Sequence, residues 1–282
     1  MSRSKGCVKS LLGGCFSVLV FFVFLGIGFS FISKYVFDLL SIESNNITEE
    51  VTTGDASGKE FYSVSYQWDH PEGFFQSSSY RLTFHIPKHE VDNAMKFLTR
   101  ISRMTYDEIG VDETVYYYDS IQFYCEYWRI VYGKIIDNNS RYINPIRRRL
   151  NEIMDNNNMT SGDKVNFLIS FVQNIDYKIP EVPLGVMPPI STLKAQYADC
   201  DSKALLLYLL LEGLSVPCVI FYSPYYQHAM LGLDYTGLTD RKVYGGDYYY
   251  FLETTYPGWE IGQLPPEMKN TDLWYVLDLK NI

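Results

Sequence analysis

The apolar run over residues 204–211 constrains the fold of this chain more than any other feature. It reads Ala-Leu-Leu-Leu-Tyr-Leu-Leu-Leu and carries no charged side chain. Eight residues are too few to cross a bilayer, which needs about 20 residues as a helix. A helix that is apolar all round lies in the centre of a domain. The run therefore predicts a buried helix that begins near Cys200 and is ended by Gly213 and Pro217.

The segments that follow this helix are typical of strands. Residues 219–222, 228–233 and 248–255 are rich in β-branched, aromatic and other apolar side chains. A buried helix followed by consecutive strands predicts an α+β fold, with the helix packed on an antiparallel sheet.

The earlier part of the chain mixes both periodicities. Residues 61–68 and 80–86 alternate as strands do, and 89–103 carry an apolar stripe at helical spacing. Residues 115–136 fit neither pattern, and the proline-rich segment 180–189 predicts an irregular loop.

Two local signals predict helix starts before the loop. Asn144-Pro145 has the pattern of an Asn cap with proline in the first turn. Thr160 with Asp163 has the pattern of a capping box.

A charge-free apolar segment over residues 10–33 predicts a transmembrane anchor, which we place at 10–40. Arg3, Lys5 and Lys9 precede it and favour a cytoplasmic N-terminus, with the body outside the cytoplasm. A cleaved signal peptide is the alternative. Its apolar stretch is usually about 7–15 residues, which is shorter than this one.

The domain organisation that we expect has five parts. They are a cytoplasmic N-terminus (1–9), the anchor (10–40), a polar linker (41–60), a β-rich subdomain (61–139) and a domain containing the buried helix (140–282).

The charge argues against nucleic-acid binding. The chain carries a formal net charge of -9, and residues 1–34 contribute +4, so the remainder carries -9 minus 4, or -13. Phosphate contacts need a basic face. Three cysteines lie in the body, so at least one thiol stays unpaired within it. Cys125 and Cys218 either pair or are small buried hydrophobic residues.

Cys200 has the position of a reactive thiol. With Asp199 as the cap it becomes the first helical residue, where unpaired N–H groups lower a thiol pKa and can bind an oxyanion. The negative charges of Asp199 and Asp201 act in the opposite direction. A protonated imidazole nearby would offset them.

His228 and Glu253 complete a candidate triad with Cys200. His228 is the only histidine after Cys200, and it opens a strand. Glu253 is an acid in an otherwise apolar strand, where a carboxylate is costly unless paired. The alternative is a buried cysteine, a surface histidine and a structural salt bridge.

Six segments in this order resemble the transglutaminase-like superfamily, and a membrane-anchored prokaryotic branch more closely. They are Phe-Val-Gln-Asn-Ile-Asp-Tyr (171–177), Pro-Ile-Ser-Thr-Leu (189–193), Asp-Cys-Asp-Ser-Lys (199–203), His-Ala-Met-Leu-Gly (228–232), Tyr-Tyr-Phe-Leu-Glu-Thr-Thr (249–255) and Gly-Trp-Glu-Ile-Gly (258–262). The resemblance covers residues 140–265. It implies a papain-like core and acyl transfer or hydrolysis through a thioester. Cys200 would be the nucleophile, His228 the general base and acid, and Glu253 the orienting acid.

Two residues depart from the family pattern. Glu253 stands where the superfamily usually has Asp, and Ala198 stands where the branch commonly has Gly. The Cys200 N–H is the expected oxyanion donor, with Gln196 as a side-chain candidate and Asp199 as a supporting residue.

We therefore expect a single-pass membrane enzyme, a hydrolase or acyltransferase, with a protein or peptide substrate outside the cytoplasm. The alternative is a non-catalytic module that binds a protein or a cell-envelope polymer. No cofactor or metal is expected, because Pro87 separates His85 from His89 and spoils a helical metal pair.

Overall fold

The computed structural model describes residues 46–52, 60–71 and 77–280. The chain divides into two units, residues 1–45 with 71–78, and residues 46–70 with 79–282. The elements discussed below lie in the second unit, apart from strand-end residues 71, 77 and 78. The anchor expected over 10–40 lies outside the described residues. Within the described ranges, none of the helices combines the length and the hydrophobicity of a transmembrane span.

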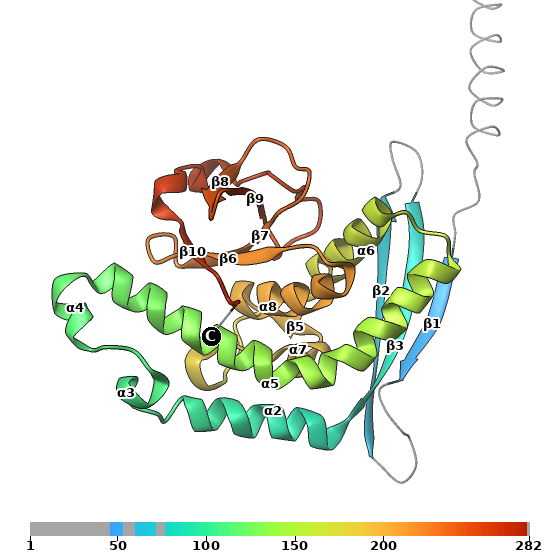
Figure 1. The fold of residues 1–282 in the computed structure, drawn as a ribbon. Coiled ribbons are helices and arrows are strands. Elements are labelled where there is room, and N and C mark those ends of the chain that lie inside the picture. The colour runs from blue at the N-terminus through green and yellow to red at the C-terminus, as the bar shows by residue number, and fades with distance from the viewer. Residues whose placement is uncertain (1–45, 53–59, 72–76, 281–282) are drawn as a thin grey trace, which may run out of the picture. The chain divides into compact units, whose positions relative to one another are not determined.

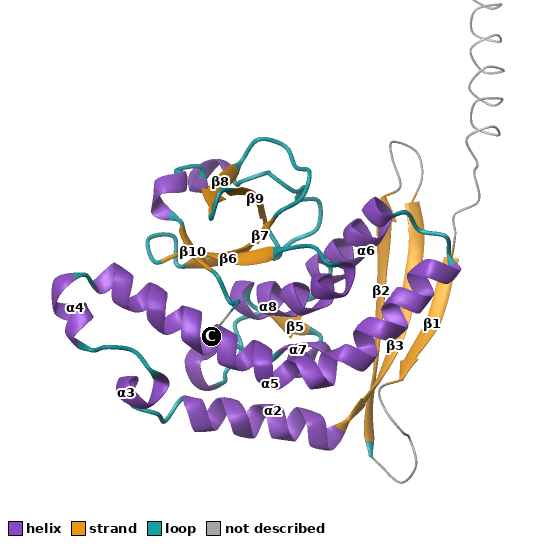
Figure 2. Cartoon of the chain, viewed as in Figure 1, coloured by secondary structure: helices purple, strands orange, loops and turns teal. Residues whose placement is uncertain are grey.

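The second unit is a mixture of helices and antiparallel and parallel strands, as the α+β prediction requires (Figures 1 and 2). The helices are α2 (Lys88–Ile101), α3 (Tyr106–Ile109), α4 (Thr114–Tyr118), α5 (Ser120–Asn156), α6 (Ser161–Gln173), α7 (Pro189–Ala195) and α8 (Cys200–Leu211). The strands are β1 (Asn46–Thr52), β2 (Phe61–Pro71), β3 (Ser77–Pro87), β4 (Asp176–Tyr177), β5 (Tyr197–Ala198), β6 (Cys218–Ser223), β7 (His228–Leu233), β8 (Arg241–Tyr244), β9 (Asp247–Leu252) and β10 (Tyr275–Leu277).

The helix α8 is the buried central helix that its sequence predicts. Every residue from Ser202 to Leu211 is buried, and the helix packs on β7 with α5, α6 and α7 around it. Burying one leucine side chain contributes about 1.5–3 kcal/mol, so this helix is a main source of core stability.

The sheet beneath α8 has five strands in the order β10-β6-β7-β9-β8. All four pairings are antiparallel, with Leu231 opposite Leu252 between the two central strands β7 and β9. The strands predicted over 219–222, 228–233 and 248–255 are therefore present. The last one ends at Leu252, so Glu253 lies just beyond it.

A second sheet, in the order β1-β3-β2, includes part of the segment expected to be a linker. Residues 46–52 form β1, which pairs parallel with β3. Ile47 and Val51 are buried, and Glu49 between them pairs with Arg149 of α5 at 3.0 Å. The segment is therefore a strand that buries Ile47 and Val51, and its Glu49 has an ion-pair partner 100 residues away in sequence.

The helix α5 runs from Ser120 to Asn156 and so crosses residue 140, where a subdomain boundary is expected. The segment 61–139 is not β-rich throughout: after β2 and β3 it holds α2, α3, α4 and the first half of α5. Residues 115–136, which fit neither periodicity, are helical.

Pro145 lies inside α5, so the helix start predicted at Asn144 is wrong. An interior proline removes one backbone hydrogen bond and bends a helix. Asn139 and Ser140 add bonds to carbonyls four residues back, at 3.0 and 2.9 Å, which also favour bending. Figure 1 shows that α5 changes direction part-way along its length. Buried residues such as Ile143 and Ile146 on both sides of the proline keep the helix continuous.

The capping box predicted at Thr160 is confirmed. The Thr160 hydroxyl accepts from the Asp163 N–H, and the Asp163 carboxylate accepts from the Thr160 N–H at 3.0 Å. The predicted loop over 180–189 contains one 3-10 turn, Pro183–Gly185, and ends where α7 begins at Pro189.

Candidate functional site

Cys200 is held at the first position of α8 by the residues around it. The Asp199 carboxylate accepts from the Ser202 N–H at 3.1 Å and from the Ser202 hydroxyl at 2.5 Å. That hydroxyl in turn accepts from the Met187 N–H at 2.7 Å. The predicted cap is therefore present, and the Cys200 N–H, as the first helical donor, has no partner within its own helix.

The thiol itself lies in a buried, acidic environment, with Cys200 8% exposed. Its sulfur donates to Asp201 Oδ1 at 3.2 Å, and Asp201 Oδ2 accepts from the Tyr132 hydroxyl of α5 at 2.6 Å. Burial raises the pKa of Cys200 well above its ordinary value, and Asp201 and Asp199 raise it further. A hydrogen bond from the Ala229 N–H acts in the opposite direction but does not outweigh them. These contacts favour the thiol form of Cys200 over the thiolate.

His228 and Glu253 form a direct pair beside the thiol. The distance between His228 Nε2 and Glu253 Oε2 is 2.8 Å. Glu253 Oε1 accepts from the Thr255 N–H at 2.8 Å and from the Thr255 hydroxyl at 2.6 Å. Burial raises the pKa of Glu253, but the bond and charge of His228 and the bonds from Thr255 outweigh it, so the net pKa is lowered. Because the carboxylate is ionised, His228 Nε2–H donates to it, and Nδ1 is left as an acceptor.

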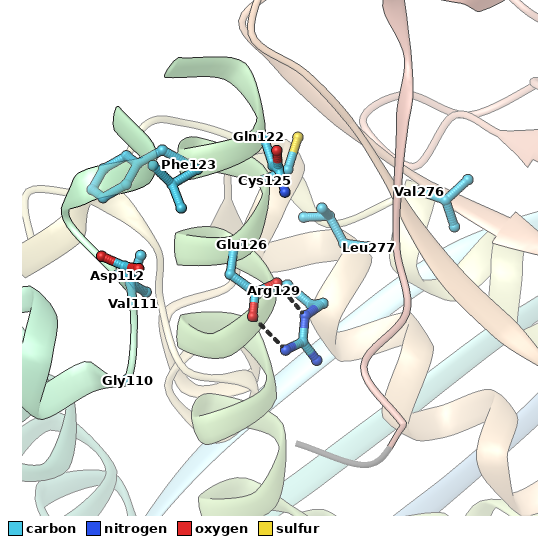
Figure 3. A pocket seen from close by; sticks show the side chains of 11 residues that line it. Gly110, Val111, Asp112, Gln122, Phe123, Cys125, Glu126, Arg129, Val276 and Leu277 are labelled. Atoms are coloured by element: carbon cyan, nitrogen blue, oxygen red, sulfur yellow. Dashed lines mark hydrogen bonds and ion pairs between the residues drawn. The ribbon is translucent and has the colours of Figure 1, made fainter. Parts of the chain in front are cut away.

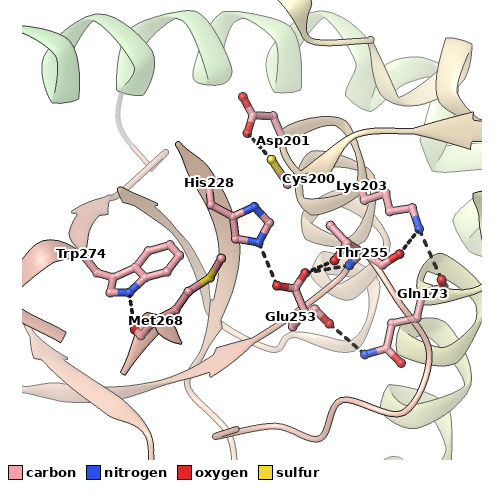
Figure 4. Close-up of polar contacts among 9 residues, drawn as sticks. All are labelled: Gln173, Cys200, Asp201, Lys203, His228, Glu253, Thr255, Met268 and Trp274. Carbon is pink, nitrogen blue, oxygen red and sulfur yellow. Dashed lines mark hydrogen bonds and ion pairs between the residues drawn. The ribbon is translucent and has the colours of Figure 1, made fainter. Parts of the chain in front are cut away.

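The imidazole lies between the acid and the sulfur. Figure 4 shows Glu253 bonded to one ring nitrogen of His228 and the other ring nitrogen on the side of Cys200. The hydrogen bond from Ala229, the residue after His228, to the sulfur places the start of β7 against the thiol. The structure thus brings together Cys200, His228 and Glu253, from the start of α8, the start of β7 and the end of β9.

Lys203 supports this arrangement and was not singled out from the sequence. It is fully buried, and its Nζ donates to the carbonyls of Gln173 at 3.3 Å, of Ile175, and of Thr255 at 2.8 Å. Burial lowers the pKa of Lys203 to about 8, although Glu253 and Asp176 act to raise it. The sequence feature that could have identified Lys203 is that it is the one cation in the buried helix α8.

Gln173 joins the same support. Its side-chain amide donates to the Glu253 carbonyl at 2.8 Å and to the Trp259 carbonyl at 2.9 Å (Figure 4). The acid is therefore fixed through its side chain by Thr255, and through its backbone by the end of α6. A carboxylate fixed in this way keeps the His228 imidazole bonded to it in one orientation.

Gln196 does not reach the thiol. Its side-chain amide donates to the Ser65 carbonyl of β2 at 2.6 Å, and its own backbone is left-handed with φ 62°. The expected role of Gln196 as an oxyanion donor is thus not supported by its position. Asp199, expected as a supporting residue, is the cap of α8.

Tyr177 is a second residue that the sequence did not single out. Burial raises its pKa to about 12, and the next causes are the charges of Cys200 and Asp199, which places the phenol near the thiol. Its ring packs against Tyr256 with centroids 5.7 Å apart, and both side chains are exposed. These two tyrosines form an aromatic surface beside the site.

Cys125 and Cys218 are both free, so the pairing left open by the sequence does not occur. Burial raises the pKa of Cys218, and it raises the pKa of Cys125 to about 11. Cys125 lines a separate cavity of about 320 Å³ between α5, the segment before α4, and β10 (Figure 3). Glu126 and Arg129 form an ion pair at 2.7 Å in its wall. Neither thiol has a histidine–carboxylate pair among the contacts described.

No group of three or more potential metal-binding side chains occurs among the described residues.

Comparison of the chain with family models, curated proteins and solved structures gives no match. The assignment of function therefore has to rest on the geometry around Cys200.

Proposed function

We propose that this chain is a transglutaminase-like thiol enzyme that cleaves or transfers acyl groups at amide bonds. The observation that carries the proposal is the 2.8 Å bond between His228 and Glu253 beside a cysteine at a helix start. A buried central helix packed on an antiparallel sheet supports the papain-like core that this function implies.

The first half of the reaction follows from the roles that the geometry allows. His228 Nδ1 takes the proton of the Cys200 thiol, and the sulfur attacks the carbonyl carbon of a bound amide. Glu253 stabilises the imidazolium that forms. The Cys200 N–H, which has no partner within α8, donates to the developing oxyanion. Collapse breaks the C–N bond, the amine leaves with the proton from His228, and a thioester to Cys200 remains.

The second half releases the acyl group. His228 Nδ1 takes a proton from water or from an acceptor amine, which attacks the thioester carbonyl. The sulfur leaves and regains the proton from His228, so the free enzyme is restored. Water as acceptor gives hydrolysis, and an amine gives a new amide bond.

A non-catalytic module that binds a protein or a cell-envelope polymer is the second candidate. The observation that favours it is the thiol, whose pKa is raised and whose hydrogen bond goes to Asp201. The exposed pair of Tyr177 and Tyr256 would then serve as a contact surface. The two candidates differ in whether His228 activates Cys200.

Thiol labelling separates the two candidates. We expect iodoacetamide to label Cys200 of the detergent-solubilised full chain at pH 6, where an ordinary thiol is almost entirely protonated. His228→Ala should slow this labelling by at least about tenfold, because it removes the base that takes the thiol proton, and a positioned general base contributes about 10²–10⁴-fold to a rate. Glu253→Gln should slow it to a lesser extent. Site-resolved mass spectrometry measures each rate.

Cys125→Ser is the matched control, because it removes a free thiol outside the site. It should leave the labelling rate of Cys200 unchanged. Equal rates for the wild type and His228→Ala would contradict the enzyme and favour the binding module.

We also propose that the enzyme is a single-pass membrane protein with its body outside the cytoplasm, acting on a protein or peptide. The charge-free residues 10–33 after three basic residues support this location.

A further inference from the structure

A groove between α2 and α5 is basic although the protein as a whole is acidic. Four cations line it: Lys96 and Arg100 from α2, and Lys134 and Arg141 from α5. Asp137 is the one acid among its lining residues, so the groove has a formal charge of +3. The whole chain has a net charge of -9. Such a local reversal of sign attracts anions.

None of the four cations forms an ion pair with an acid in the part of the chain that the structure describes. Other cations of the same helix do, as Arg147 with Glu212 at 3.0 Å and Arg149 with Glu49 at 3.0 Å illustrate. The groove therefore keeps its positive charge available to a ligand.

Aromatic rings hold both guanidinium groups in place. Arg100 lies over the ring of Phe97 at 5.0 Å, and Arg141 lies over the ring of Tyr142 at 4.6 Å. Arg141 also donates to the Tyr142 hydroxyl at 2.6 Å. Stacking leaves the N–H edges of a guanidinium free for bidentate bonds to an oxyanion.

The floor of the groove contains a polar atom in need of a partner. Asn138 Oδ1 is buried and has no hydrogen bond among the described residues. A buried carboxamide oxygen without a partner is destabilising. A half-turn of the amide presents N–H donors instead of the oxygen, and a protonated phosphate can itself donate to the oxygen. Either orientation suits a phosphate group.

We propose that this groove binds a phosphate group carried by a small organic molecule or a lipid headgroup. The main cavity has a volume of about 430 Å³, which exceeds what inorganic phosphate alone requires. Ile101 and Met104 supply an apolar end for the organic part. The site is distinct from the Cys200 site and does not depend on the function proposed for it.

Isothermal titration of the detergent-solubilised full chain with inorganic phosphate tests the proposal. We expect saturable binding that is displaced by raising the sodium chloride concentration, because screening weakens exposed charge contacts. The double variant Arg100→Gln/Arg141→Gln should weaken binding at least tenfold. Arg148→Gln, an exposed cation of the same helix outside the groove, should bind as the wild type does.

Thermal unfolding of each variant shows whether it is folded, and Cys200→Ala should bind phosphate as the wild type does. Absence of binding to the wild type at millimolar phosphate would overturn the proposal, as would equal affinity in the double variant.

Two further titrants distinguish the sources of the phosphate. Glycerol 3-phosphate represents a small molecule, and dihexanoyl phosphatidic acid represents a lipid headgroup, both in neutral detergent. Tighter binding of the lipid identifies a headgroup site, and equal or tighter binding of glycerol 3-phosphate identifies a small-molecule site. If the double variant binds both compounds as well as the wild type does, the groove is not the site.

Discussion

At the scale of single residues, the Cys200 thiol lies beside two acids that raise its pKa, and a hydrogen bond from the Ala229 N–H opposes part of that rise. Asp199 has a pKa raised to about 6, first by burial and then by the charge of Asp201, with bonds from Ser202 acting against the rise. The same two acids raise the pKa of Cys200. The cap that starts α8 therefore also suppresses the thiol that α8 presents.

Asp199→Asn is expected to keep the cap and remove this charge. The folded-state pKa of about 6 lies above the ordinary 3.8, so Asp199 favours the folded state most at low pH. That contribution is lost as pH rises from about 4 through 6, and it amounts to about 3 kcal/mol for a shift of this size. Denaturant unfolding at pH 4 and pH 7 should show this loss in the wild type and a smaller loss in the variant.

The variant should also label faster at Cys200, because one cause of the raised thiol pKa is gone. If the two proteins show parallel pH dependence and equal labelling, Asp199 is not coupled to folding or to the thiol.

The candidate triad residues are easier to predict from the sequence than the residues that hold them in place. Cys200 is conspicuous because it lies at a predicted helix start, where a thiol can be activated. Glu253 is conspicuous because a carboxylate in an apolar strand is costly unless it is paired. Lys203 and Tyr132 are not, because their partners (three carbonyls and the Asp201 carboxylate) lie 28 to 69 residues away in sequence. The bond of Gln196 to the Ser65 carbonyl is equally hidden from the sequence, since Ser65 is 131 residues distant.

At the scale of elements, the central strands are packed without spare room. Gly232 of β7 faces side chains of β6, and a Cβ there would lie 2.6 Å from Phe221 and 2.7 Å from Val219. Phe221 stacks on Phe251 with centroids 4.0 Å apart, so it has little space to withdraw. The strand that begins with His228 is therefore fixed against its neighbours.

Gly232→Ala is expected to lower the free energy of unfolding by about 1–3 kcal/mol, which is typical of overpacking a core. Gly162→Ala in α6 is the matched control, because its nearest neighbours would be at 3.7 and 3.9 Å. The control should be neutral or stabilised by up to about 1 kcal/mol through helix propensity. Denaturant unfolding of both variants makes the comparison, and equal stabilities would show that β7 can shift.

Elements with strong local signals were predictable, and elements decided by distant contacts were not. The Thr160 capping box and the all-apolar α8 are local signals, and both are present. Asn144-Pro145 gives an equally good local signal for a helix start, yet buried residues on either side of it continue α5. The strand β1 has a polar sequence and depends on β3 and Arg149.

At the scale of the whole molecule, the charge distribution predicts one orientation in the membrane. A reporter fused after Ile282 that is active only outside the cytoplasm should be active, because Arg3, Lys5 and Lys9 favour a cytoplasmic N-terminus. Replacing these three residues by glutamine should reduce that activity, while Lys178→Gln in the body should not. An inactive reporter in the wild type would contradict the proposed location.

The α+β class could be predicted because a buried helix and the strands after it are adjacent in sequence. The division into subdomains could not, because α5 contacts elements from β1 to β10 and joins the parts that the sequence suggested separating.

The lysine clamp has a consequence for how the protein matures. Lys203 joins carbonyls of residues 173, 175 and 255, and so ties α8 to chain that is synthesised some fifty residues later. Until that later chain arrives, Glu253 has no fixed position and His228 has no partner. If His228 activates Cys200 as proposed, the thiol of a nascent chain would stay unreactive until residues 253–255 have been synthesised and have folded into place.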